Sequence, residues 1–270
     1  MNYLNNFPLK LQEFLEDKEV KKHTIGHSDS DVFQISNQNN AQRWFLKILR
    51  KKKSYNSLAY EKEVLTWLND KTLVPKIEFY IATEEYEYLV ISELKGMILS
   101  SKENISKNPR KTIEEFAKGL KTLHEIEIKD CPFKQDLQVK IEIASRNVYR
   151  NHINKECFLS EFRHLSPGEM LDFLVKNKPQ EDLVFTHGDY TLPNVIYDGN
   201  QVGFIDLGLS GVSDKYMDIA VAIKTIRFNL NILGLEYLLN ELIDLFCFYY
   251  GILQLNEKKI EYYLMLDDLF

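Results

Sequence analysis

The sequence contains few cysteines, and none of them are closely spaced. Cys131, Cys157 and Cys247 lie far apart in a chain of 270 residues. An odd number of cysteines without a C-x-x-C pair argues against both a disulfide framework and a zinc site. We therefore expect reduced thiols and a location in the cytoplasm.

Long apolar runs, internal repeats and an excess of basic residues are also missing. The most apolar stretch, 242–250, is too short to span a bilayer, and the first 17 residues lack the basic-then-apolar order of a signal peptide. The net charge is -6, which disfavours nucleic acid as a partner and suits a cationic small ligand. We expect no membrane partner, and the sequence leaves the oligomeric state open.

The two halves of the chain differ in their hydrophobic patterns. In the first half we predict helices within 1–17 and over 57–69, and strands at 21–25, 32–36, 44–49, 76–82 and 88–92. From Gly96 onward we predict helices at 112–126, 136–151 and 169–176, a helical region from Asp214 to a last helix at 256–267, and a hairpin at 193–206 as the only strand-like part. The prediction is an α+β fold with an antiparallel-sheet domain at 1–95, a mainly helical domain at 96–270, and a ligand crevice near residues 92–96.

Lys47 stands in an apolar strand, Trp44-Phe45-Leu46-Lys47-Ile48-Leu49. Burying its charge is costly without a partner, and Glu61 in the next helix is a candidate for that partner. The alternative is an edge-strand lysine at the surface, beside Arg50 and three further lysines. Strand alternation places Phe45 on the same face as Lys47.

The stretch THGDYTLPNVIYDGNQVGFID, residues 186–206, gathers polar groups around a hairpin. Asp189 precedes Asn194 by five positions, and Asp206 follows an apolar strand. We expect Gly208 to supply the unusual backbone angles that aim Asp206 inward. Because no second histidine stands near His187, it is interpreted as a packed residue that braces the loop. Such a set predicts a magnesium ion with a phosphate beyond it, or else a solvated loop.

The order of these groups resembles that of protein kinases: a polar loop at IGHSDSDV, a strand lysine, a helix glutamate, Asp with Asn five later, then Asp-x-Gly. With HGDYTLPN and DLG, the chain most resembles the aminoglycoside 3′-phosphotransferases (kanamycin kinases). The matching stretches run from residue 25 to the end: IGHSDSDVF, WFLKIL, VLTWL, ISELKG, DCPF, LVFTHGDYTLPN, GFIDLGLSG, DKYMDIA, TIR and LDDLF.

The resemblance implies a two-lobed protein-kinase-like fold and transfer of the γ-phosphate of ATP or GTP, with Mg²⁺, to a hydroxyl of a kanamycin-type antibiotic. It implies that Asp189 is catalytic and that Asn194 and Asp206 bind the metal. The implied nucleotide-binding residues are Ser28, Phe45, Lys47, Glu61, Ser92 and Leu94, where Phe45 packs on the adenine and the last two lie in the linker beside it.

The implied substrate-binding residues are mostly acidic, as a polycationic drug requires. They are Asp189, Glu156, Glu161, Arg227, Asp267, Asp268 and Phe270. Many relatives carry Arg where this chain has Leu209, and acids where it has Phe228 and Asn229. These departures leave the accepted drugs open.

Three other functions compete with this interpretation. A kinase of the same fold acting on choline, a sugar or another antibiotic is favoured by Phe228 and Asn229. A non-catalytic nucleotide-binding protein would not need Lys47, Asp189 and Asn194 together. A metallohydrolase built on His187 lacks further ligands at suitable spacing.

Overall fold

The computed structural model describes residues 7–23, 30–37, 41–51 and 57–270. Its residues group into two compact units: Met1–Lys95 with Phe204–Gly208, and Gly96–Gly203 with Leu209–Phe270. Our domain boundaries placed Phe204–Gly208 in the second half, whereas these residues group with the first unit. The division of nucleotide binding and catalysis between the two domains, and the crevice near residues 92–96, stay predictions.

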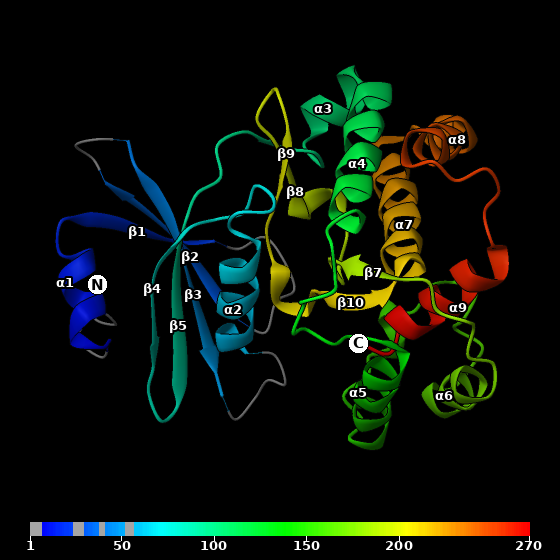
Figure 1. Cartoon of the computed structure of the whole chain (residues 1–270), viewed down its shortest axis with the longest axis horizontal. Coiled ribbons are helices and arrows are strands. Elements are labelled where there is room, and N and C mark those ends of the chain that lie inside the picture. The colour runs from blue at the N-terminus through cyan, green and yellow to red at the C-terminus, as the bar shows by residue number, and fades with distance from the viewer. Residues whose placement is uncertain (1–6, 24–29, 38–40, 52–56) are drawn as a thin grey trace. The chain divides into compact units, whose positions relative to one another are not determined.

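The first unit is built on a five-stranded sheet with the order β1-β2-β3-β5-β4 (Figure 1). Every neighbouring pair is antiparallel. The strands are β1 (Lys18–His23), β2 (Asp31–Asn37), β3 (Arg43–Arg50), β4 (Ile77–Ala82) and β5 (Tyr86–Ser92). All five were predicted, with ends displaced by a few residues, so the expected sheet is confirmed.

Helices cover both faces of this sheet (Figure 1). Helix α1 (Leu9–Leu15) buries Leu11 and Leu15 against Trp44 and Leu46 of β3. Helix α2 (Leu58–Leu68) contacts β4 and β5. Because successive side chains of a strand point to opposite faces, β3 presents Trp44 and Leu46 to α1 and Lys47, which follows Leu46, to α2.

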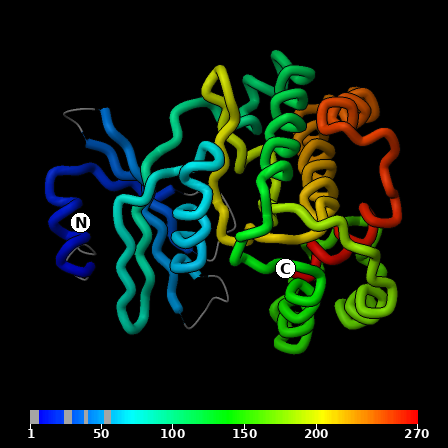
Figure 2. The backbone as a smooth tube through the Cα atoms, in the orientation of Figure 1, coloured from blue at the N-terminus to red at the C-terminus, as the bar shows by residue number. Residues whose placement is uncertain are grey.

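The second unit is mainly helical. Its helices are α3 (Lys102–Lys107), α4 (Pro109–His124), α5 (Leu137–Tyr149), α6 (Pro167–Lys176), α7 (Lys215–Leu233), α8 (Leu239–Tyr250) and α9 (Glu257–Asp267). Helix α4 packs on α8, and α7 packs on α9, the last helix, as the chain trace in Figure 2 shows. Helix α6 begins with a capping box, in which Ser166 is paired with Glu169. The predicted α+β fold is confirmed.

The second unit holds more strands than the predicted hairpin. That hairpin is present as β8 (Val195–Tyr197) and β9 (Val202–Phe204), and β6 (Met97–Ile98) pairs with β8. In addition, β7 (Leu183–Thr186) pairs antiparallel with β10 (Gly211–Asp214). The expectation that the hairpin was the only strand-like part was therefore wrong. Strands of two to four residues, one of them reading Gly-Val-Ser-Asp, carry almost no periodic signal.

Over the part of the chain that the structure describes, no helix has both the length and the apolar character needed to cross a bilayer.

Candidate active site

Lys47 is buried in the middle of the first unit's sheet. Its strand lies between β2 and β5, which excludes the edge-strand alternative. The Lys47 ammonium is 2.6 Å from a carboxylate oxygen of Glu61. Both side chains are almost fully buried, at 7% and 4% exposure. The predicted pairing of Lys47 with Glu61 is confirmed.

Asp206 is a second partner of Lys47, and we did not predict this contact. Its carboxylate bonds the same ammonium, while its side chain remains half exposed. Burial alone would lower the pKa of Lys47, but the charges of Asp206 and Glu61 outweigh it and hold that pKa above its ordinary value. The lysine is therefore a fixed positive charge.

Asp206 itself adopts a left-handed backbone conformation, with φ of 60°. The expectation that Gly208 would supply the unusual angles was wrong, because Gly208 lies in a short 3-10 turn, Leu207–Leu209, and is not among the glycines with positive φ. Aspartate tolerates this conformation better than most residues. The chain therefore turns at Asp206 itself.

The remaining predicted nucleotide-binding residues have the following places in the first unit. Phe45 is half-buried on β3, with its ring edge-on to His23 at 6.0 Å between centroids. Ser92 ends β5 and donates its N–H to the carbonyl of Lys76 at 2.8 Å, so it belongs to the strand rather than to the linker that we predicted. Leu94 lies beyond the strand and is half-buried. Ser28 lies outside the described residues.

Asp189 belongs to a loop of the second unit that is anchored through its backbone. The carboxylate of Asp218, on α7, accepts the N–H groups of His187 at 2.6 Å and Gly188 at 2.8 Å. Its oxygen also bonds His124 of α4 at 3.0 Å. Asp218 and His187 are fully buried, so the loop is attached to the helices of the second unit by buried hydrogen bonds.

The packed role predicted for His187 is confirmed. The Asp189 N–H donates to its Nδ1 at 3.3 Å, and its carbonyl accepts the Ser210 hydroxyl at 2.8 Å. Gly188 has φ of 84°, and a Cβ there would lie 2.2 Å from the carbonyl oxygen of Leu209. No side chain fits that space, so the Gly in HGD is required by the fold.

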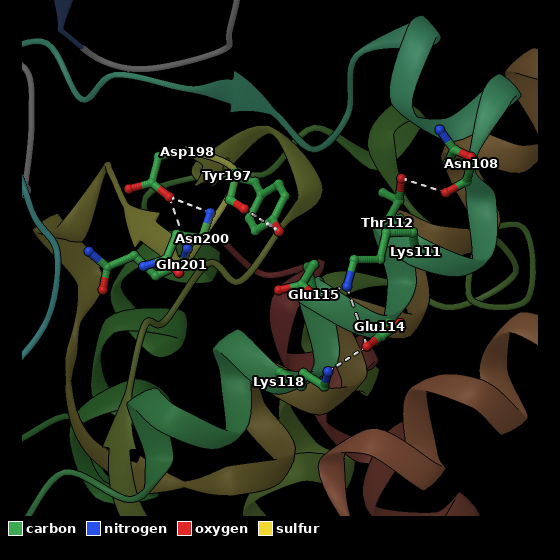
Figure 3. Close-up of polar contacts among 11 residues, drawn as sticks. Asn108, Lys111, Thr112, Glu114, Glu115, Lys118, Tyr197, Asp198, Asn200 and Gln201 are labelled. Carbon is green, nitrogen blue, oxygen red and sulfur yellow. Dashed lines mark hydrogen bonds and ion pairs between the residues drawn. The ribbon is translucent and has the colours of Figure 1, made fainter.

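Asn194 is tied directly to Asp189. Its amide nitrogen donates to the carbonyl of Asp189 at 3.0 Å and to the carboxylate at 2.9 Å. The hairpin that follows is closed by Asp198, whose carboxylate accepts the N–H groups of Asn200 and Gln201 (Figure 3). The turn therefore sets where β8 ends and β9 begins, while β8 itself starts directly after Asn194.

The acidic C-terminal pair is already bound within the second unit. Lys224 of α7 is 2.7 Å from a carboxylate oxygen of Asp267 and 3.2 Å from one of Asp268. Asp268 is nearly inaccessible and also accepts the N–H of Leu159 at 2.8 Å. Phe270 is partly exposed. Asp267 is the more accessible acid of the pair.

The predicted acidic segment carries few free charges. Glu161 lies 3.8 Å from the guanidinium of Arg227, and both side chains are about half exposed. Glu156 sits in an exposed 3-10 turn, Lys155–Cys157. The structure thus pairs two residues that we had predicted to bind substrate, Glu161 and Arg227.

Several residues that shape this site were missed. Asp218 stands in the DKYMDIA stretch, where a carboxylate inside the apolar run Met217–Ile223 is the signal that a partner is required. His124, Lys224 and Lys140 lie on the buried faces of their helices or close to them, and nothing in their spacing identifies their partners. Lys140 is fully buried and forms no hydrogen bond with any described residue.

The chemistry of Asn194 and Asp206 fits a hard cation such as Mg²⁺. The Asn194 amide nitrogen is used by Asp189, which leaves its side-chain oxygen as the available donor atom, and Asp206 contributes a carboxylate. Oxygen donors in small number, completed by phosphate, are usual for Mg²⁺. Within the described ranges, no three His, Cys, Asp or Glu side chains gather at one point.

Comparison with known proteins shows the family to which the chain belongs. Residues 19–250 match the model of the phosphotransferase enzyme family. Curated aminoglycoside 3′-phosphotransferases of Niallia circulans and Enterococcus faecalis are 34% and 32% identical, covering 98% and 97% of both chains.

Solved structures share the fold along the whole chain. The structure of a type VIII aminoglycoside 3′-phosphotransferase superposes with a TM-score of 0.85 at 24% identity, covering all of both chains. An aminoglycoside phosphotransferase of Streptomyces rimosus, in complex with ADP and streptomycin, gives 0.82 at 26% identity over 100% of this chain and 99% of that one. The protein belongs to the phosphotransferase enzyme family. It has a protein-kinase-like fold and is an enzyme that transfers a phosphoryl group to an alcohol.

Proposed function

We propose that this protein transfers the γ-phosphate of a nucleoside triphosphate to the 3′-hydroxyl of a kanamycin- or neomycin-type aminoglycoside, and so confers resistance. The observation that carries the proposal is the relationship to 3′-phosphotransferases along nearly the whole chain. The Streptomyces relative with ADP and streptomycin bound supports both kinds of ligand.

Lys47 is the residue we assign to the nucleotide phosphates. Its charge is permanent and its position is set by Glu61, so it offers the triphosphate a fixed cation. Phosphoryl transfer depends mainly on such positioning and charge neutralisation. Phe45 would pack on the base, and Leu94 and Ser92 would lie beside its edge, with Ser28 near the phosphates.

Asp189 is the residue we assign to the acceptor. Its carboxylate orients the hydroxyl and takes its proton as the oxygen–phosphorus bond forms and the bond to the leaving nucleoside diphosphate breaks. The Asn194 amide holds one carboxylate oxygen of Asp189. The anchored loop therefore presents the base without a reorganisation step.

Asn194 and Asp206 would hold Mg²⁺ through their side-chain oxygens. The ion would neutralise charge on the phosphates as transfer proceeds. Holding both the ion and Lys47 gives Asp206 two roles.

Acceptor recognition is assigned to the acids near the C-terminus. Of Asp267 and Asp268, Asp267 is the leading candidate because it is the more accessible of the two. Glu156, Glu161, Asp268 and Phe270 are further contacts. Lys224 and Arg227 already form ion pairs with some of these acids. An incoming drug ammonium would have to compete with them.

That competition favours a second candidate, phosphorylation of a different small alcohol. Phe228 is 63% exposed where an acid would help hold an amine. A neutral or singly charged acceptor would not need the missing acids.

The deciding experiment measures ADP or GDP release with kanamycin, neomycin, choline and common sugars as acceptors. We expect turnover with the aminoglycosides, and the position of the phosphate in the product, read by NMR, identifies the hydroxyl. Release with choline or a sugar, and none with any aminoglycoside, would establish the second candidate instead.

A further inference from the structure

Glu87 is a buried carboxylate that joins the sheet to helix α2. It lies on β5 with 8% of its surface exposed. One oxygen accepts the N–H of Leu58 at 2.6 Å and that of Ala59 at 3.3 Å. The hydroxyl of Ser57 lies 3.3 Å from the same oxygen. Glu87 therefore binds the first turn of α2 from outside the helix.

The helix does not need Glu87 as its cap. Ser57 already occupies the N-cap position, and its side chain accepts the N–H groups of Ala59 and Tyr60. A local serine is the common solution for a helix start. The carboxylate of Glu87, which is distant in sequence and bonds the same turn, therefore attaches α2 to β5. The hydroxyl of Tyr80, on β4, also bonds Glu87, and burial together with this carboxylate raises the pKa of Tyr80 to about 12.

Glu87 and Lys47 reach α2 from the same face of the sheet. In the β3–β5 register Glu87 lies opposite Leu49, two residues along β3 from Lys47. Residues directly opposite in a ladder point to the same side, as do residues two apart. Glu87 holds the helix at Leu58, and Lys47 holds it at Glu61. The bonds at Leu58 and Glu61 lie one helical turn apart. Together they restrict the rotation of α2 about its axis and its translation along the sheet.

We propose that Glu87 is a positioning residue of the nucleotide site, which keeps Glu61 in the place where it holds Lys47. The inference rests on the proposed function only in that Lys47 binds the phosphates. Loss of Glu87 would leave the first turn of α2 without this polar attachment, while the bond between Lys47 and Glu61 and the apolar packing of the helix remain. The Lys47 charge would then be less well placed, and nucleotide affinity would fall while acceptor affinity would not.

The test compares Glu87→Gln with a matched control in the second unit. Glu181 is a half-buried glutamate that accepts the N–H of Leu137 at the start of α5 from a distance, at 2.9 Å. Glu181→Gln therefore weakens a comparable long-range attachment within the second unit. Binding of ATP and GTP with Mg²⁺ is measured by calorimetry without acceptor, and KM for each substrate by steady-state kinetics.

We expect Glu87→Gln to weaken nucleotide binding about five- to twentyfold, because small misplacements of positioned groups are costly. Its acceptor KM should stay within about twofold of wild type, and Glu181→Gln should leave the nucleotide dissociation constant unchanged. Glu87→Met should have a larger effect than Glu87→Gln, because it removes every hydrogen bond.

A double-mutant cycle with Glu61→Gln shows whether Glu87 acts through Glu61. We expect Glu87→Gln to add less than about twofold in the Glu61→Gln background, because the position it maintains is no longer used. Equal nucleotide affinity in wild type and Glu87→Gln would overturn the inference, as would an undiminished effect in the Glu61→Gln background. A wild-type protein that binds neither ATP nor GTP would instead overturn the proposed function, and this inference with it.

Discussion

Two buried lysines have opposite surroundings. Lys47 meets two carboxylates, which raise its pKa. Lys140 of α5 is equally buried, but its ammonium bonds no described residue and lies 5.4 Å from the ring centroid of Phe270. Burial lowers the pKa of Lys140 to about 8, against the charges of Asp218, Asp267 and Asp189. The paired lysine suits a functional charge, whereas the unpaired one costs stability.

Lys140→Met is expected to stabilise the protein at neutral pH and to change its pH dependence. The folded pKa of Lys140, about 8, lies below the ordinary 10.5, so the unfolded state binds this proton more tightly. The lysine therefore destabilises the fold below pH 8, and this cost, on the order of 3 kcal/mol, disappears as pH rises toward 10.5.

Denaturant unfolding of wild type and Lys140→Met between pH 7 and 10 measures this difference. The difference in unfolding free energy between Lys140→Met and wild type should become smaller as pH rises. Lys129→Met, at an exposed position, should show no such trend. A gap that is constant in pH would contradict the assignment.

Asp189→Asn is expected to lower kcat by about 10²–10⁴-fold, because the amide cannot take the acceptor proton. The nucleotide dissociation constant should stay near that of wild type, since the nucleotide contacts are assigned to the first unit. Single-turnover kinetics and nucleotide titration measure the two quantities. Near-normal turnover would refute the catalytic role.

At the scale of elements, α7 is the support of the second unit's site. Near the start of α7, Asp218 accepts hydrogen bonds from the loop that carries Asp189. Further along the same helix, Lys224 forms ion pairs with Asp267 and Asp268. Helix α7 therefore supports both the residue proposed as the base and the acids proposed to bind the acceptor. Substitutions that remove the contacts of α7 should therefore lower both kcat and the free energy of unfolding.

Asp218→Asn is expected to cost about 2–4 kcal/mol of unfolding free energy, because the substitution weakens charge-assisted hydrogen bonds to His187 and Gly188. It should also lower kcat, since the loop of Asp189 loses its anchor. Urea unfolding and steady-state kinetics report both effects. Asp244→Asn, at an exposed site on α8, should change neither. A stability loss without any change in kcat would show that the anchor is not needed for turnover.

Elements with a long periodic pattern were predicted well. The amphipathic face of α4, with Ile113, Phe116 and Leu120 buried, follows directly from 3.6-residue spacing. The β7–β10 pair was missed because four-residue strands gain their stability from the partner strand, not from their own sequence. Short helix α3 was missed for the same reason, as six residues define little more than one turn.

At the scale of the whole molecule, the net charge of -6 predicts salt-sensitive capture of a cationic acceptor. Raising ionic strength from about 0.05 to about 0.5 M shortens the Debye length roughly threefold and weakens steering. We expect kcat/KM for kanamycin to fall severalfold, and to fall further for neomycin, which carries more amino groups. An increase with salt would argue against a polycationic acceptor and favour the second candidate function.

The sequence by itself determined the identity of the chemical groups: a lysine in an apolar strand needs a carboxylate, and HGD with Asn five residues later places a carboxylate beside an amide. It also determined the long helices and the five-stranded sheet, because both depend on local periodicity. Only the tertiary structure decided that Asp206 shares Lys47 with Glu61, that Asp218 holds the loop, and that Lys224 occupies the terminal acids. These contacts join residues 30 to 159 positions apart. A sequence pattern reports which group needs a partner, whereas the choice among the many possible partners is made by packing.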